Sequence, residues 1–245
     1  MLVLLPPSET KRPGGVGVSI DKAAIIWAAL DPARDVAINA LVQLCQDEEA
    51  AAKSLKLGKT NRKDIQANLE IMTSPTMPAL QRYAGVLYDA LGYDDLSKNA
   101  LQRAQNQMFI QSSLFGLVPA LERIPYYRLS AGSLLPGVSL SKLWADAHRD
   151  VWPRLTGQIL DMRSKAYVSL NPIPKDKDSF FLEVLDANSG KALNHFNKKA
   201  KGAFAKALLE TGLESSSEIP KVAKVAGLEA RVSGRIVELF VPASF

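Results

Sequence analysis

The sequence is poor in the residues that most often hold metals. It contains one cysteine, Cys45, and two widely separated histidines, His148 and His195. A single cysteine excludes an intrachain disulfide framework and fits a reducing compartment. Without paired cysteines or closely spaced histidines there is no zinc-ligand pattern, so we predict no metal site and no cofactor. Cys45 lies in an apolar helical pattern and is expected to be a buried core residue.

Long apolar runs are also missing. The longest helical one, residues 23–30, is far below the roughly 20 residues that a membrane span needs. The run at residues 2–5 is too short for a signal peptide, and Pro6 and Pro7 end it. With 47% hydrophobic and 22% charged residues, the composition is that of an ordinary soluble globular protein. We therefore expect a cytoplasmic protein that folds as one domain over residues 1–245.

The familiar phosphate-binding and catalytic motifs are absent. Gly58-Lys59-Thr60 resembles the end of a P-loop, but the required glycine five residues earlier is Lys53. No serine lies in a Gly-x-Ser-x-Gly turn, so nucleophilic catalysis has only weak support. The weak catalytic candidates are Ser8, Ser164 and Tyr167. Whether the protein is an enzyme stays open, and a protein that is not an enzyme is favoured.

Strand and helix patterns alternate over the first two thirds of the chain, and strands cluster near its end. The predicted strands cover residues 1–5, 108–118, 158–162, 180–185, 229–232 and 236–241. The predicted helices cover residues 21–30, 32–45, 64–72, 94–107, 140–155 and 198–211. This order predicts a mixed α/β fold, with a mixed central sheet covered by helices.

Positive charge is the clearest excess, with a formal net charge of +5 and an isoelectric point near 9.2. It is concentrated at the start of a predicted helix that has Asn197 as a plausible N-cap and Gly212 as a plausible stop. The lysines of its first turn are Lys198, Lys199 and Lys201. Because the helix dipole disfavours cations there, a shared anionic ligand such as phosphate would explain them. The alternative is a solvated polar face.

Other basic and aromatic residues could assist. Lys59 and Arg62 edge a glycine turn between helical segments, which could hold a phosphodiester backbone or be a basic surface turn. Arginine with tyrosine suits phosphate binding and base stacking. The residues of this kind near strand ends are Arg82, Tyr83, Tyr88, Arg123, Tyr126, Tyr127, Arg128, Trp144 and Arg163.

Seven separated stretches match one family in amino-acid sequence and in their order along the chain. They are residues 4–11 (LLPPSETK), 83–88 (YAGVLY), 113–119 (SLFGLVP), 124–129 (IPYYRL), 144–146 (WAD), 161–167 (DMRSKAY) and 196–202 (FNKKAKG). Together they resemble the YaaA family of bacterial peroxide-stress-response proteins over nearly the whole chain.

The resemblance implies an α/β domain with a basic cleft, DNA binding, and protection from peroxide by limiting unincorporated iron. It also implies a helix-hairpin-helix-like element at Gly58–Lys63, where the match is poorest. Glu9 departs from relatives that have lysine at that place in the first loop, which contains Lys11.

Two functions remain in competition. In the first, the protein binds DNA in a salt-sensitive and weakly sequence-specific way. The predicted contacts are Lys198, Lys199, Lys201, Arg123, Arg128, Tyr126, Lys59, Arg62 and Lys11. In the second, it is an enzyme that acts on a phosphate-bearing small molecule or nucleotide. The predicted site residues are then Ser8, Arg128, Ser164, Tyr167 and Lys198. Direct iron sequestration is a third reading with the least support.

Overall fold

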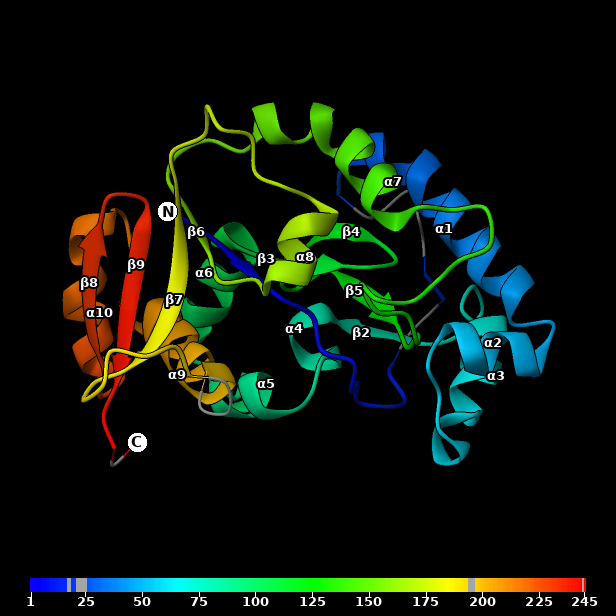
Figure 1. Cartoon of the computed structure of the whole chain (residues 1–245), viewed down its shortest axis with the longest axis horizontal. Coiled ribbons are helices and arrows are strands. Elements are labelled where there is room, and N and C mark those ends of the chain that lie inside the picture. The colour runs from blue at the N-terminus through cyan, green and yellow to red at the C-terminus, as the bar shows by residue number, and fades with distance from the viewer. Residues whose placement is uncertain (17–18, 21–25, 194–196, 244) are drawn as a thin grey trace.

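A seven-stranded mixed sheet forms the centre of the protein (Figure 1). The computed structural model describes residues 1–16, 19–20, 26–193, 197–243 and 245. The strand order is β4-β3-β1-β6-β7-β9-β8, and the strands are β1 (Leu2–Leu5), β3 (Met108–Ser112), β4 (Gly116–Pro119), β6 (Ile159–Asp161), β7 (Ser179–Asp186), β8 (Glu229–Ser233) and β9 (Ile236–Val241). The five inner strands are parallel, and the edge strands β4 and β8 are antiparallel to their neighbours.

The mixed α/β fold predicted from the sequence is thus confirmed. A separate two-stranded antiparallel pair joins β2 (Thr76–Pro78) to β5 (Arg123–Pro125). The α-helices are α1 (Asp31–Leu44), α2 (Glu48–Ser54), α3 (Lys63–Leu69), α4 (Ala79–Arg82), α5 (Val86–Leu91), α6 (Lys98–Gln107), α7 (Leu140–Ala147), α8 (Lys165–Leu170), α9 (Asn197–Thr211) and α10 (Ile219–Val225). The short 3₁₀ turns are η2 (Ala28–Leu30), η3 (Lys59–Asn61), η4 (Tyr93–Asp95), η5 (His148–Asp150), η6 (Trp152–Arg154) and η7 (Ser216–Glu218).

Strand β1 is apolar throughout because both faces of the sheet are covered there. Leu4 packs with Trp152 and Leu155 of the η6 region on one face. Its neighbours Val3 and Leu5 point to the opposite face and belong to the larger core. Helices α5, α6, α9 and α10 pack against one another in a layer on that larger core.

Helix α9 begins and ends where the sequence predicts. Gly212 follows it with a φ of +82°, and its amide donates to the Leu208 carbonyl at 2.9 Å, which is a glycine C-terminal stop. On its inner face, Gly202 lies against the turn of α5 that contains Leu87. A Cβ at position 202 would approach the Leu87 carbonyl oxygen to 2.1 Å, so this close crossing requires glycine.

Some predicted boundaries are wrong. Residues 108–118 form two strands, β3 and β4, because Gly116 with a φ of +72° turns the chain back. The helix predicted over 140–155 ends at Ala147 and continues as η5 and η6, where Pro153 interrupts the helical pattern. Half of the helix predicted over 21–30, residues 21–25, lies outside the described residues, and its end forms η2. None of the described helices has the length and apolar character to cross a bilayer.

The strand order reverses beside β1. The chain passes from β1 to β3 on one side, whereas β6, β7 and β9 follow on the other. In open α/β sheets, ligands bind outside the carboxyl ends of the strands at such a reversal. In this chain that place is outside β1 and β6, where the segments after Leu5 and Asp161 emerge.

We expect Gly202→Ala to destabilise the protein by about 1–3 kcal/mol, because the added methyl group must push α9 away from α5. Gly58→Ala is the matched control, since a Cβ there meets nothing within 4 Å and φ is −75°. Urea denaturation of both variants measures the difference. Equal stabilities would contradict the close packing of α9 on α5.

Candidate functional site

Lys11 lies deep in the loop that follows β1. Its side chain is buried, with only 5% of the residue exposed. The Nζ atom donates to the carbonyl oxygens of Ser8 at 3.0 Å and Glu9 at 3.5 Å. It also lies over two aromatic rings, 4.1 Å from the centroid of Tyr127 and 5.3 Å from that of Tyr83. The lysine is therefore held by backbone oxygens and aromatic faces.

A chain of buried hydroxyl groups borders Lys11. The Tyr83 and Tyr127 hydroxyls are 2.7 Å apart, and the Tyr127 hydroxyl is 2.8 Å from Oγ of Ser112 at the end of β3. Tyr88 packs on Tyr83 at 5.4 Å between ring centroids and donates to the Pro6 carbonyl at 2.7 Å. Hydroxyl groups from α4, β3 and the segment after β5 thus converge beside the end of β1.

Arg128 brings a second cation to the same place. Its guanidinium donates to the Glu9 carbonyl at 3.2 Å and to the Glu9 carboxylate at 2.8 Å. Because Lys11 donates to the same Glu9 carbonyl, the two cationic groups lie within a few ångströms of each other. The Arg128 side chain is 14% exposed and the Glu9 side chain 61% exposed. Solvent therefore reaches the Glu9–Arg128 ion pair.

We call this group the carboxyl-edge site. Its members are Ser8, Lys11, Tyr83, Tyr127, Arg128 and Tyr167. Ser8 belongs to the site because its carbonyl accepts from Nζ of Lys11, and its Oγ lies beside Gly85, where a Cβ would be 3.5 Å away. Tyr167 enters from α8, and its hydroxyl accepts from the Ala131 amide at 3.3 Å.

Burial strongly perturbs the ionisation of this site. Desolvation, and then the neighbouring Arg128 guanidinium, lower the pKa of Lys11 to about 7. The carboxylates of Glu9 and Asp64 oppose this lowering of the pKa, but no described carboxylate forms an ion pair with Lys11. Burial also raises the pKa of Tyr83 and of Tyr127 above the ordinary tyrosine value. At neutral pH the lysine is thus divided between its charged and neutral forms, while both tyrosines remain protonated.

A buried ion pair joins the two strands that flank β1. Arg163 binds Asp161 through two bonds of 2.8 Å, from Nε to Oδ1 and from Nη2 to Oδ2. Its Nη1 also donates to Gln111 of β3 at 3.3 Å and to the Asn171 carbonyl at 2.9 Å. Since β1 lies between β3 and β6, these bonds join the two strands that flank it.

Lys201 does not belong to a solvated face. It is 6% exposed, and its Nζ donates to the Met162 carbonyl at 2.9 Å, directly after β6. Burial lowers its pKa to about 8, against a smaller opposing effect of Asp161. The solvated-face alternative is therefore wrong for Lys201, whereas Lys198 and Lys199 are exposed in the first turn of α9. His195 lies outside the described residues.

The remaining predicted contacts are not brought together. Lys59 is exposed on η3, between α2 and α3. Arg62 binds the carboxylates of Glu48 and Glu49. Arg123 donates to the carbonyls of Val16 and Thr76. Tyr126 donates from its hydroxyl to Asp64 at 2.9 Å. Lys59 is thus available to a ligand, while the other three are engaged within the protein.

The predicted catalytic serines have no activating base among the described residues. Ser8 Oγ and Ser164 Oγ are hydrogen-bonded to no described histidine or carboxylate. His148 is a core residue, since its Nε2 accepts from the Leu117 amide at 3.1 Å and its Nδ1 lies 2.7 Å from the Trp144 carbonyl. Ser164 precedes α8, whose first turn carries Tyr167 to the site. A catalytic role of these serines stays a prediction.

Two cavities lie elsewhere in the protein. One of about 500 Å³ lies between α1 and α7, and another of about 610 Å³ lies beside η6. No residue of the carboxyl-edge site lines either of them. In the described part of the chain, no three histidine, cysteine, aspartate or glutamate side chains are grouped as metal ligands.

All members of the carboxyl-edge site are candidates in the sequence, but the sequence does not indicate that they all meet. Lys11 was one predicted basic contact among many, and its burial had no marker beyond its place after a buried strand. Tyr83, Tyr127 and Arg163 were recognised as strand-end polar residues, but their mutual bonds depend on strand order. The useful signal was that Ser8, Ser112 and Arg163 each lie at or just after the end of a buried strand.

The fold and the site define an open α/β protein with a lysine- and tyrosine-lined candidate ligand site where the strand order reverses. The comparisons with known sequences then give the family. The family model described as peroxide stress protein YaaA matches residues 1–232, so the chain belongs to that family.

Its relatives include a UPF0246 protein of Corynebacterium efficiens, 36% identical over 95% of this chain and 96% of the relative. A UPF0246 protein of Streptomyces coelicolor is 37% identical over 94% and 91%. An uncharacterized protein of Campylobacter jejuni is 24% identical over 89% of each chain.

The low pKa of Lys11 predicts a pH-dependent effect of Lys11→Met. Between about pH 7 and the ordinary value of 10.5, the unfolded chain binds a proton at Lys11 that the folded chain has lost. The stability of the wild type therefore rises with pH in this window, whereas the variant lacks this contribution.

The free energy of unfolding of Lys11→Met minus that of the wild type should be larger at pH 6 than at pH 9. We expect this change to be at least about 1 kcal/mol, because one pKa unit corresponds to about 1.4 kcal/mol. Urea denaturation at the two pH values checks this. Lys198→Met removes an exposed lysine and should show no such change. A Lys11→Met difference that is constant with pH would contradict the lowered pKa.

Proposed function

We propose that this member of the peroxide stress protein YaaA family binds DNA through exposed lysines. In this role it would protect DNA under peroxide stress and limit unincorporated iron, as the family resemblance implies. Binding would be weakly sequence-specific, because exposed lysines neutralise phosphates without reading base edges. The observation that carries the proposal is the pair Lys198 and Lys199 in the first turn of α9.

The first turn of α9 favours an anion for two reasons. Both lysines are exposed, and the turn contains no acidic residue. The positive end of the helix dipole repels them, so a phosphate that binds there removes an unfavourable interaction and gains two charge-assisted contacts. Lys199 also lies 4.8 Å from the ring centroid of Phe245, which positions its ammonium group at the C-terminus of the chain.

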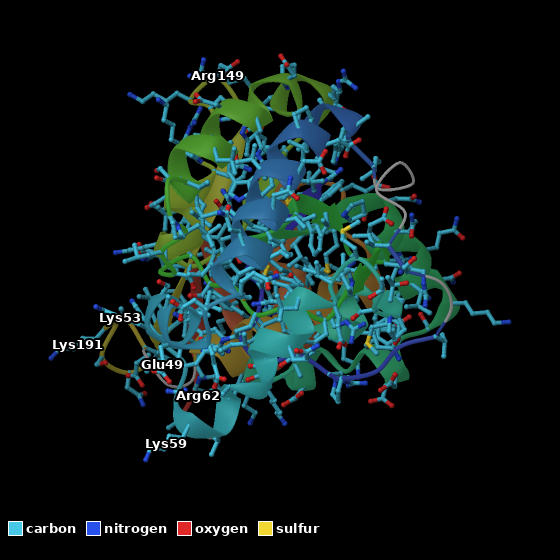
Figure 2. All side chains as sticks on the ribbon, turned by 90° about the vertical axis from the view of Figure 1, so that its right-hand side faces the viewer. Glu49, Lys53, Lys59, Arg62, Arg149 and Lys191 are labelled. Atoms are coloured by element: carbon cyan, nitrogen blue, oxygen red, sulfur yellow. The ribbon has the colours of Figure 1, made fainter. Side chains whose placement is uncertain are left out.

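A second basic segment supports the same function. Figure 2 shows Lys59 projecting from the turn between α2 and α3, beside Arg62 and Glu49. Lys53, on α2, projects from the same hairpin. Arg62 is bonded to Glu48 and Glu49, so it would orient this turn, and the lysines would contact the backbone of DNA. Figure 1 shows the α2–α3 hairpin well apart from α9, so an extended polyanion would be needed to contact both.

The test is Lys198→Ala together with Lys199→Ala, with duplex affinity measured against salt concentration. Each phosphate contact contributes about 0.9 to the slope of log affinity against log salt, so the slope should fall in magnitude by about 2. Lys221→Ala with Lys224→Ala is the matched control, because it removes two exposed lysines from α10. If both double variants lose the same affinity, only net charge matters and the α9 interface is wrong.

The carboxyl-edge site supports a second function, the binding of a small phosphate-bearing molecule such as a nucleotide. Lys11 and Arg128 converge on the Glu9 carbonyl, and tyrosine rings border them. A guanidinium binds phosphate oxygens through two bonds. The Glu9 carboxylate binds the Arg128 guanidinium in the way that a phosphate group would. Because the Glu9 side chain is exposed, an anionic ligand can displace its carboxylate from Arg128.

Calorimetric titration with nucleoside monophosphates tests this function. Arg128→Met should lower affinity about tenfold or more, as expected for loss of a charged hydrogen bond worth about 1.5–3 kcal/mol. Arg12→Met is the matched control, because Arg12 also binds a carboxylate, Asp94, at 2.8 Å but on the exposed surface. No binding by the wild type, or equal losses in both variants, would reject the site.

A further inference from the structure

We propose that Lys11 is a nucleophilic amine that forms an imine with an aldehyde or ketone carrying a phosphate group. The proposal rests on the second function above, an anionic ligand at the carboxyl-edge site, and adds a covalent step to it. It does not depend on duplex binding by α9.

The geometry around Nζ suits a nucleophile. A neutral amine has two hydrogens and one lone pair, and two backbone carbonyls accept from Nζ of Lys11. With both hydrogens directed to the Ser8 and Glu9 oxygens, the lone pair is left for an electrophile. The Tyr83 and Tyr127 rings shield the amine, so little water competes with a bound carbonyl group.

Lys11 forms no ion pair with a described carboxylate. Buried lysines that serve only structure are usually paired with a carboxylate, because an unpaired buried charge is costly. The carboxylates of Glu9 and Asp64 act on Lys11 only from beyond ion-pair distance, and Arg128 and Arg82 oppose its positive charge. Glu9 is instead bonded to Arg128. Burial beside another cation is an arrangement that activates lysine for Schiff-base chemistry.

Arg128 would bind the phosphate group of the ligand. Its guanidinium shares the Glu9 carbonyl with Lys11, so an anion on Arg128 would place an attached carbonyl group near the amine. The Glu9 carboxylate would then turn into solvent, where most of its side chain already lies. The preferred substrate is therefore short, with few atoms between phosphate and carbonyl.

The reaction needs no oxidant or reductant. The Nζ lone pair attacks the carbonyl carbon, a C–N bond forms and the C=O π bond breaks. The carbonyl oxygen takes a proton from the Tyr127 or Tyr83 hydroxyl, which regains a proton from Nζ. The carbinolamine then loses its hydroxyl group as water, with the second Nζ proton passed to it through the same hydroxyls, and the C=N bond forms. The hydrogen bonds from Tyr83 to Tyr127 and on to Ser112 provide a path along which that proton can be shared.

The test uses the full-length protein with glyceraldehyde 3-phosphate, followed by borohydride reduction and peptide mapping by mass spectrometry. We expect a reduced adduct on Lys11 at least tenfold above that on any exposed lysine. Glyceraldehyde, which lacks the phosphate, should give at least tenfold less. Glycerol 3-phosphate, which lacks the carbonyl, should bind and protect Lys11 from the reaction.

Variants test which residues the adduct requires, and a second aldehyde tests which substrate class the site takes. Lys11→Arg should abolish the adduct, Arg128→Met should lower it at least tenfold, and Lys221→Ala, which removes an exposed lysine of α10, should leave it unchanged. An oligonucleotide with an abasic site offers the same aldehyde and phosphate chemistry. A stronger Lys11 adduct with it than with glyceraldehyde 3-phosphate would assign the substrate to damaged DNA, and the reverse would assign it to a metabolite.

The outcomes separate the two proposals. If glycerol 3-phosphate binds but no adduct forms on Lys11 with either aldehyde, the imine is wrong and the anion site stands. If neither binding nor an adduct is found in the folded wild type, both are wrong. Adducts spread evenly over exposed lysines also overturn the imine, and this result needs no variant to be folded.

Discussion

The buried guanidinium of Arg163 is the interaction on which the arrangement of the site depends. It is fully buried, so each of its donors must find an acceptor inside the protein. Asp161 supplies two bonds, and Gln111 and the Asn171 carbonyl supply the others. Because Gln111 belongs to β3 and Asp161 ends β6, the guanidinium fixes both strands that flank β1. The loop that leaves β1 is therefore confined between two ends that cannot separate without leaving a charge unpaired.

The segment that follows β1 pairs with the backbone around Tyr83. The Arg12 amide donates to the Arg82 carbonyl at 2.8 Å, and the Ala84 amide donates to the Thr10 carbonyl at 3.0 Å. This pairing places Lys11 against Tyr83 and Tyr127. On the β6 side of the point where the strand order reverses, Lys201 donates to the Met162 carbonyl. Two buried lysines that bond to backbone oxygens at neighbouring strand ends distinguish this edge from the rest of the sheet. The exposed lysines of α9 and η3 are a separate feature, suited to a larger polyanion.

The sequence predicted the mixed sheet and the limits of α9, because both follow from local patterns of apolar and turn-forming residues. Strand β1 is a short apolar run closed by Pro6, and α9 has helical apolar spacing closed by Gly212. The division of lysines into buried and exposed groups was not predictable in the same way. Lys199 and Lys201 are two residues apart, yet only Lys201 faces the end of β6, which depends on how α9 crosses α5 at Gly202. The Lys11 environment likewise comes from residues 83 and 127, which are distant in sequence and meet only through the strand order.

The carboxyl edge beside β1 thus holds a lysine whose lowered pKa leaves it partly neutral under physiological conditions. The decisive measurement is a nuclear magnetic resonance titration of the Lys11 side chain, labelled with carbon-13 at Cε and assigned by comparison with Lys11→Arg. We expect the Cε signal to titrate with a midpoint near a pH of about 7. A midpoint near 10.5, the ordinary lysine value, would contradict it, because the amine would then be fully charged and solvated.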